Sequence, residues 1–192
     1  SAPHTDIESQ PPVTPTADAS HSRFVQRIRR RYAAELPLLP PGLPRRDTIT
    51  ALVATLQAQG RAIGSALRVA RQLVLERLAV LDIEQGAAME DVTLAMTELA
   101  EATLELALAQ AVADQSVRHG LPRTDAGAPI EFWVVGMGKL GARELNVSSD
   151  IDLVYVYEED GHTDGPQPIS AHEFFAQVAR GMQFQILLTN VE

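Results

Sequence analysis

The 192 residues are 45% hydrophobic and include no cysteine, so the chain can bury a sizeable core but has no disulfide, zinc–thiolate site or thiol nucleophile. The net charge of −9 argues against general binding to nucleic acid through its phosphates. No apolar run is long enough to span a membrane and no signal peptide is visible, so we expect a cytoplasmic protein without a membrane partner.

The chain begins with a polar segment. Residues 1–20 are rich in Pro, Ser, Thr and Ala and predict a disordered tail, which we extend to residues 1–22. Residues 23–36, "RFVQRIRRRYAAEL", combine five arginines with apolar residues at helical spacing. We interpret them as a solvated helix with a few apolar anchors rather than as a patch for an anionic partner. The four prolines of residues 37–46 end this helix.

A long amphipathic pattern follows. From a cap at Asp47 or Thr48, apolar residues recur at i, i+3, i+4 and i+7, and the stripe resumes after Gly60. This pattern predicts one helix with a bend near Gly60 or Gly64. Gly86 is expected to end it.

A second long helix is predicted from about Met89 to His119, where Gly120 and Pro122 stop it. Three glutamates share one edge of this helix. We interpret them as solvated surface rather than as a metal site, because carboxylates along a single helix face are common on exposed helices. They are Glu98, Glu101 and Glu105.

After residue 128 the pattern changes from helical to mixed. Residues 130–135, "IEFWVV", and residues 151–157, "IDLVYVY", are branched and aromatic runs typical of strands. Ser170 and Glu173 then form a capping box that predicts a final helix. The sequence therefore predicts an α+β fold, with long helices first and a sheet after them.

The loop between the two strands fits two kinds of site. Gly136, Gly138 and Gly141 match the G-x-G-x-x-G pattern of a dinucleotide-binding loop that follows a strand. A dinucleotide fold, however, needs a crossover of about a dozen residues, and only eight residues separate Gly141 from Asp150. The short connection disfavours a parallel β–α–β unit and hence a dinucleotide oxidoreductase.

Asp150 and Asp152 support the second kind of site. Alternate residues of a strand point to the same face, so we expect the two carboxylates to project together while Ile151 and Leu153 face the core. Paired carboxylates are suitable ligands for Mg²⁺, with Mn²⁺ as the alternative. A surface strand would show the same pattern, but a glycine loop with Lys139 lies just upstream and is suited to phosphate oxygens. Cation and phosphate would then share one nucleotide site.

The run G-K-L-G-x-R-E-L-N-x-S-S-D-I-D-L, residues 138–153, resembles the signature of the glutamine synthetase adenylyltransferase/adenylyl-removing enzymes. That family belongs to the DNA polymerase β-like nucleotidyltransferase superfamily, and the resemblance covers roughly residues 65–192. It implies long N-terminal helices followed by a truncated polymerase β-like nucleotidyltransferase sheet domain. The expected parts are a disordered tail over 1–22, a helical region over 23–127 and the start of the nucleotidyltransferase domain over 128–192.

Members of this family carry two such domains in one long chain. One domain puts AMP on a tyrosine of glutamine synthetase, and the other removes it by phosphorolysis and releases ADP. The acidic loop and the helix after the second strand resemble the N-terminal, adenylyl-removing copy, which is our first expectation. The alternatives are the ATP-dependent adenylyltransferase half and a non-catalytic module that docks glutamine synthetase. The resemblance also implies a PII-type nitrogen regulatory protein as a partner of the full-length enzyme.

The resemblance further implies roles for individual residues. Asp150 and Asp152 would be the catalytic residues and would bind Mg²⁺ beside ADP, ATP or AMP. Ser149 would cap the turn before the strand or touch phosphate. The superfamily also uses a third carboxylate on a later strand, which these 192 residues lack, so we expect them to be inactive or nearly so by themselves. The residues that would hold phosphate oxygens are Gly136, Gly138, Lys139 and Gly141.

Overall fold

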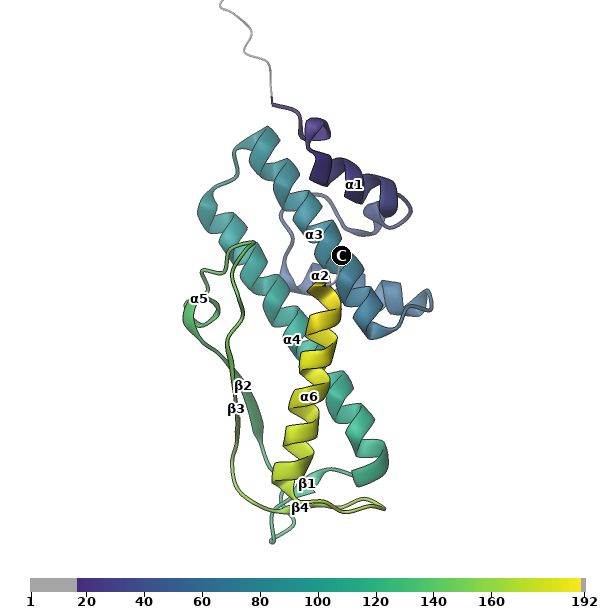
Figure 1. Ribbon diagram of the computed structural model, residues 1–192, viewed down its shortest axis with the longest axis vertical. Helices are drawn as coiled ribbons and strands as arrows, with labels where there is room; N and C mark the ends of the chain where they lie inside the picture. Colours follow the sequence, from purple (N-terminus) through teal and green to yellow (C-terminus); the bar gives the residue numbers. More distant parts are fainter. Residues whose placement is uncertain (1–16, 191–192) are drawn as a thin grey trace, which may run out of the picture.

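The computed structural model describes the backbone of residues 17–190 and the side chains of residues 17–186. The molecule is an elongated set of helices with a two-stranded ribbon along one side (Figure 1), which confirms the expected α+β class. No helix in this described part is long and apolar enough to cross a membrane. In chain order the elements are η1 (Ala19–His21), α1 (Arg23–Arg31), η2 (Leu36–Leu38), α2 (Arg46–Ala58), α3 (Ile63–Gln85), α4 (Met89–His119), β1 (Pro122–Arg123), β2 (Phe132–Gly136), α5 (Gly138–Gly141), β3 (Leu153–Tyr157), β4 (His162–Thr163) and α6 (Ala171–Asn190).

The N-terminal segment is folded where it meets α3. Residues 1–16, most of the expected tail, lie outside the described residues, whereas η1 forms within residues 17–22. Ala19 is fully buried, and its N–H donates a hydrogen bond to Glu84 Oε1 at 3.1 Å. A contact with a helix more than sixty residues away therefore orders a stretch whose own composition predicts disorder.

The helices α1, α2 and α3 pack together at one end of the molecule. Val25 and Ile28 are the buried side of α1, which confirms its interpretation as a solvated helix with apolar anchors. The predicted single bent helix is wrong, because α2 ends before Gly60, whose φ is +94°, and α3 begins anew at Ile63. Gly86 ends α3 in the left-handed conformation, as predicted.

The N-cap of α2 lies two or three residues before the predicted cap at Asp47 or Thr48. Arg45 occupies the N-cap position, and its N–H donates to Thr48 Oγ1 at 3.0 Å. Thr48 therefore caps the helix from its third position rather than as the N-cap residue itself.

The helix α4 takes part in two hydrophobic cores. Its bounds are those that the sequence predicts, and Gly120 is its C-cap residue. The N-terminal half packs into the first core, with α2 and α3, and the C-terminal half packs into the second core, with α6. Small residues let α4 and α6 approach closely, since a Cβ on Gly181 would lie 3.3 Å from Ala111 Cβ. The buried residues of α4 include Ala95, Met96, Leu99 and Ala100 in the first core and Ala107 and Ala111 in the second.

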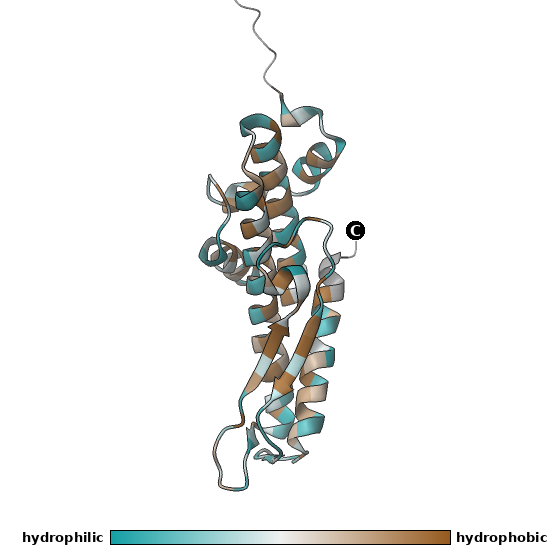
Figure 2. Cartoon of the chain, turned by 90° about the vertical axis from the view of Figure 1, so that its left-hand side faces the viewer, coloured by the Kyte–Doolittle hydropathy of each residue, from teal (hydrophilic) through white to brown (hydrophobic). Residues whose placement is uncertain are grey.

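The strands β2 and β3 form an antiparallel ribbon whose inner face lies on the second core. Phe132 pairs with Tyr157 at one end, and Gly136 pairs with Leu153 at the other. Phe132 stacks on Phe175 of α6, with ring centroids 4.6 Å apart. The outward face carries exposed apolar side chains, and both strands are largely brown, with pale bands, in Figure 2. These side chains are Trp133, Val135, Val154 and Val156.

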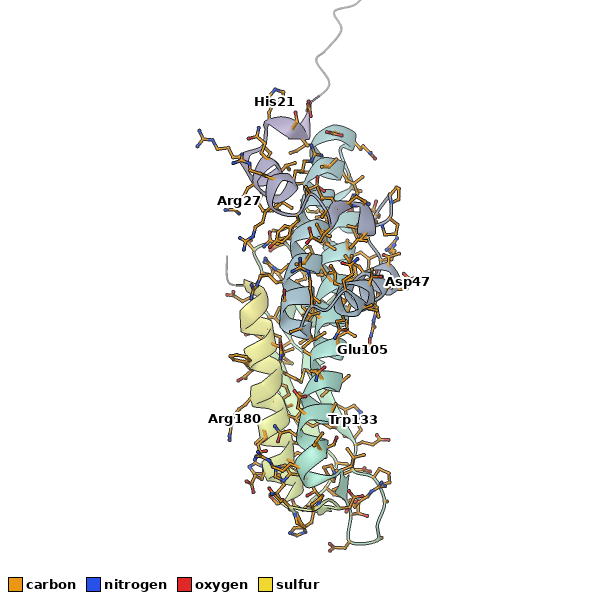
Figure 3. The ribbon with its side chains drawn as sticks, turned by 90° about the vertical axis from the view of Figure 1, so that its right-hand side faces the viewer. His21, Arg27, Asp47, Glu105, Trp133 and Arg180 are labelled. Atoms are coloured by element: carbon orange, nitrogen blue, oxygen red, sulfur yellow. The ribbon has the colours of Figure 1, made fainter. Side chains whose placement is uncertain are left out.

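The helix α6 closes the second core from the side opposite the ribbon and runs beside α4 (Figure 3). Ser170 Oγ accepts the N–H of Glu173 at 3.1 Å, so the predicted cap is present at its start. Phe174, Val178 and Met182 are fully buried on its inner side, whereas Phe184 is exposed.

We predict that Phe174→Ala lowers the free energy of unfolding by about 3–5 kcal/mol, because a fully buried ring is replaced by a cavity. Phe184→Ala is the matched control on the same helix, and it should change stability by less than about 0.5 kcal/mol because its ring is exposed. Urea unfolding followed by circular dichroism measures both. Equal losses in the two variants would contradict the assignment of the second core.

Candidate functional site

The glycine turn, residues 136–141, folds back on the end of β2. Gly138 has a φ of +55°, which L side chains rarely adopt. The N–H of Gly141 donates to Met137 O at 3.3 Å, and a Cβ on Gly141 would lie only 2.6 Å from Gly136 O. The turn geometry alone therefore requires glycine at positions 138 and 141. Lys139 is exposed on the single turn of α5.

This turn does not belong to a dinucleotide fold. The strands on either side of it are antiparallel, and the helix between them has only four residues. Dinucleotide binding requires parallel strands joined by a crossover helix. The structure therefore contradicts the oxidoreductase hypothesis.

Asp150 and Asp152 lie immediately before β3, which begins at Leu153 rather than at the acids as predicted. Both acids are exposed, whereas Ile151 and Leu153 are half-buried and pack against the first core. Exposed and half-buried residues therefore alternate over residues 150–153, as expected of a strand, although pairing with β2 begins only at Leu153. The strand β3 begins at Leu153 because its partner β2 ends at Gly136, the residue that pairs with Leu153.

One backbone hydrogen bond joins the glycine turn to the acids. Met137 N–H donates to Asp152 O at 2.9 Å, next to the last residue pair of the ribbon. The turn therefore starts beside the second acid. The glycine turn, Lys139 and Asp152 therefore lie at the same end of the ribbon.

The chain between the turn and the acids is anchored on α4. Arg143, with a φ of +59°, donates from Nη1 to Glu101 Oε1 at 2.7 Å. Two residues later, the N–H of the buried Leu145 donates to Oγ1 of the fully buried Thr97 at 3.2 Å. Thr97 and Glu101 are one helical turn apart, so a single face of α4 fixes the approach to the acid pair. No local sequence pattern identifies Thr97, and the helical spacing that singles out Glu101 does not indicate its partner Arg143.

The glutamates of α4 also bind the start of α2, and this corrects their assignment to solvated surface. Arg46 N–H donates to Glu98 Oε2 at 2.8 Å, and its guanidinium lies 3.6 Å from Glu101. The side chains of Glu98 and Glu101 are only 17% and 22% exposed, and Glu105, at 62%, fits the prediction better. Glu105 accepts from Arg46 Nη2 at 2.6 Å, and this hydrogen bond raises the pKa of Arg46.

Ser149 uses its hydroxyl within the turn that precedes the acids. It donates to Asn146 Oδ1 at 2.7 Å and accepts the N–H of Asn146 at 3.1 Å. The N–H of Ser148 donates to the same Oδ1 at 3.2 Å. Of the two roles expected for Ser149, the geometry favours capping the turn. These bonds hold residues 146–149 in one conformation.

Four of the predicted residues line two different cavities, whereas Gly138, Lys139 and Asp152 line neither of them. A cleft of about 570 Å³ lies beside the glycine turn and is lined by Gly136, Gly141 and Arg143, among others. A separate cavity of about 320 Å³ lies between α3, α4 and residues 145–151, and Ser149 and Asp150 belong to its wall. The glycine turn and Asp150 therefore line two neighbouring cavities rather than one pocket.

Two carboxylates are available for a metal ion. Among the residues that the structure describes, no group of three or more His, Cys, Asp and Glu could hold one. Mg²⁺, however, is commonly bound through one or two carboxylates and completes its octahedron with water and substrate phosphate. Asp150 and Asp152 are exposed hard-oxygen donors beside a phosphate-type turn, so they fit that mode of binding.

Comparison with known proteins points to one family. The family described as "Glutamate-ammonia ligase adenylyltransferase" matches residues 20–189. Relatives named "Bifunctional glutamine synthetase adenylyltransferase/adenylyl-removing enzyme" include that of Burkholderia mallei, 48% identical over 62% of this chain and 13% of the relative. The proteins of Ralstonia nicotianae and Aromatoleum aromaticum are 38% and 36% identical over 84% and 93% of this chain. The chain spans only 13–20% of the length of these relatives.

We predict that Thr97→Val destabilises the fold by about 1–3 kcal/mol, because the buried Leu145 N–H loses its acceptor while the side-chain shape is kept. Amide hydrogen exchange should rise in residues 143–150. Thr55→Val is the control, since its exposed hydroxyl bonds only to Ala51 O of its own helix. Unchanged exchange in the Thr97 variant would show that α4 does not hold this segment.

Proposed function

The chain belongs to the glutamate-ammonia ligase adenylyltransferase family, and we propose that it is the part of a glutamine synthetase-regulating enzyme that begins a nucleotidyltransferase site. The observation that carries this proposal is the hydrogen bond that sets the glycine turn against Asp152. This backbone bond brings the glycine turn and residues 150–152 to one end of the ribbon.

Within that enzyme we assign the chain to the adenylyl-removing half. The resemblance of its acidic loop and following helix to the N-terminal copy supports this half over the adenylyltransferase half. The reaction is phosphorolysis of adenylyl-tyrosine on glutamine synthetase. An oxygen of inorganic phosphate bonds to the α-phosphorus of the AMP group, the bond from phosphorus to the tyrosine oxygen breaks, and ADP and a free tyrosine result.

Each part of the candidate site has a role in this reaction. Asp150 and Asp152 hold Mg²⁺, which supplies charge neutralisation at the phosphoryl oxygens. The N–H groups of the glycine turn and the ammonium of Lys139 bind and orient phosphate oxygens. Because the reaction needs positioning and charge rather than a covalent protein intermediate, no nucleophilic side chain is required.

A docking module for glutamine synthetase is the second candidate. The exposed apolar face of the ribbon favours it, because contiguous exposed apolar side chains often mark interaction sites. The acid pair separates the two proposals, since a docking module does not need it.

We predict that Asp150→Asn or Asp152→Asn weakens Mn²⁺ binding, followed by electron paramagnetic resonance with ADP present, by more than about tenfold. The basis is that even partners in the outer shell of a metal site change affinity by 10–100-fold. Placed in the full-length parent enzyme, either change should abolish release of ADP from adenylylated glutamine synthetase.

Asp125→Asn is the matched control, because Asp125 is exposed in the loop before β2, away from the turn. It should leave Mn²⁺ binding and ADP release unchanged. Loss of ADP release with glutamine synthetase binding intact supports the catalytic assignment. Unchanged ADP release in both acid variants would leave the docking module as the function.

A further inference from the structure

Arg71 on α3 is half-buried and has no acceptor among the residues that the structure describes. Its neighbours Ala70, Leu73 and Val74 are buried in the first core. Other half-buried arginines have defined acceptors among the described residues. Arg29 bonds to Glu76, Arg61 to Glu35, Arg77 to the carbonyls of Leu39, Pro40 and Gly42, and Arg123 to Asp164.

Arg71 belongs to the wall of the cavity of about 320 Å³, which lies between α3, α4 and residues 145–151 and also touches Ile186 of α6. Much of this cavity is apolar, with Met96, Leu99 and Ile151 among its lining residues. The opposite wall is the chain that leads into the acid pair, including Ser149 and Asp150. The volume lies at the lower end of the range for small-molecule sites.

A charge in these surroundings is unfavourable unless something compensates it. Burial lowers the pKa of Arg71, which means that the protein environment disfavours the charged form. Arginine nevertheless stays protonated in proteins, so the charge remains. Arg71 is half-exposed, so water compensates part of its charge, and the desolvated part decreases stability. The residue is therefore poorly explained by a role in packing.

The chemistry of the guanidinium indicates which kind of ligand would compensate its charge. A guanidinium presents five N–H donors in a planar fork that matches the oxygens of phosphate and carboxylate. Asp150, the acid of the same cavity, forms no ion pair with Arg71 in the described structure. An anion that enters the cavity would supply such oxygens, and it would lie beside Asp150 and any cation held there.

We propose that Arg71 binds a phosphate group in the cavity between α3, α4 and residues 145–151. The identification of that anion as phosphate rests on the proposed function, in which inorganic phosphate and the AMP group both enter the site. Inorganic phosphate and the AMP group both present phosphate oxygens to the guanidinium. Arg71 is then a binding residue contributed by the helical region, about eighty residues before the acid pair.

The first test is a calorimetric titration of the chain with inorganic phosphate and, separately, with AMP, in the presence of EDTA. Arg71→Gln should weaken binding by about tenfold or more, and Arg71→Lys should keep part of it because the charge remains. The probe that loses affinity identifies the source of the phosphate. Arg118→Gln, which removes an exposed charge at the far end of α4, is the matched control and should bind like the wild type.

The second test measures the Tm of the chain, because an arginine with a purely structural role would give a different change in Tm. Arg71→Met should raise the Tm of the chain without phosphate, since the uncompensated charge is gone. Added phosphate should raise the Tm of the wild type but not of this variant. A Tm lower than that of the wild type, together with a normal response to phosphate, would overturn the proposal.

The two proposals can fail independently. Mn²⁺ binding by the Asp152→Asn variant reports on the proposed function, and metal-free phosphate binding by Arg71→Gln reports on this inference. Unchanged phosphate and AMP affinities in Arg71→Gln, or no binding of either probe by the wild type, would overturn the assignment of Arg71 even if the acid pair binds metal.

Discussion

Both hydrophobic cores are built on α4, and this shared helix fixes the geometry of the candidate site. Its 31 residues extend about 46 Å at the usual rise per residue. The N-terminal half packs with α2 and α3 and carries Thr97 and Glu101, which hold the chain before the acids. The C-terminal half packs against α6, on which the ribbon lies. The turn, the acids and the helical region are therefore positioned relative to one rigid element.

The charged groups around this helix fall into two kinds. Arg46 and Arg143 form pairs with glutamates at the edge of α4, and such exposed or half-exposed pairs contribute little to stability. Their effect is to orient the segments that carry them. Arg71 is the opposite case, because its burial costs free energy and no described residue compensates it. A charged side chain that lowers stability in a cavity beside an acid pair is more typical of a binding residue than of a packing residue.

Local sequence patterns predicted much of the fold. The bounds of α4 followed from an unbroken apolar stripe that ends at Gly120 and Pro122, and the short connection after Gly141 correctly disfavoured parallel strands. The break at Gly60 was missed because the apolar stripe resumes on its far side. The partners of Glu98, Glu101 and Glu105 lie 42–59 residues away in the sequence, beyond the reach of helical periodicity. Arg71 was missed for the same reason, since its desolvation depends on the packing of α3 against other elements.

The opposite environments of the acids and the arginine have a consequence for ligand binding. Asp150 and Asp152 are exposed, so water already compensates their charges and a cation alone gains little by displacing it. Arg71 is partly desolvated, so a phosphate would gain more there. If both proposals hold, a cation on the acids and a phosphate on Arg71 occupy neighbouring sites. Any effect of one ligand on the affinity for the other is then reciprocal, as linkage requires.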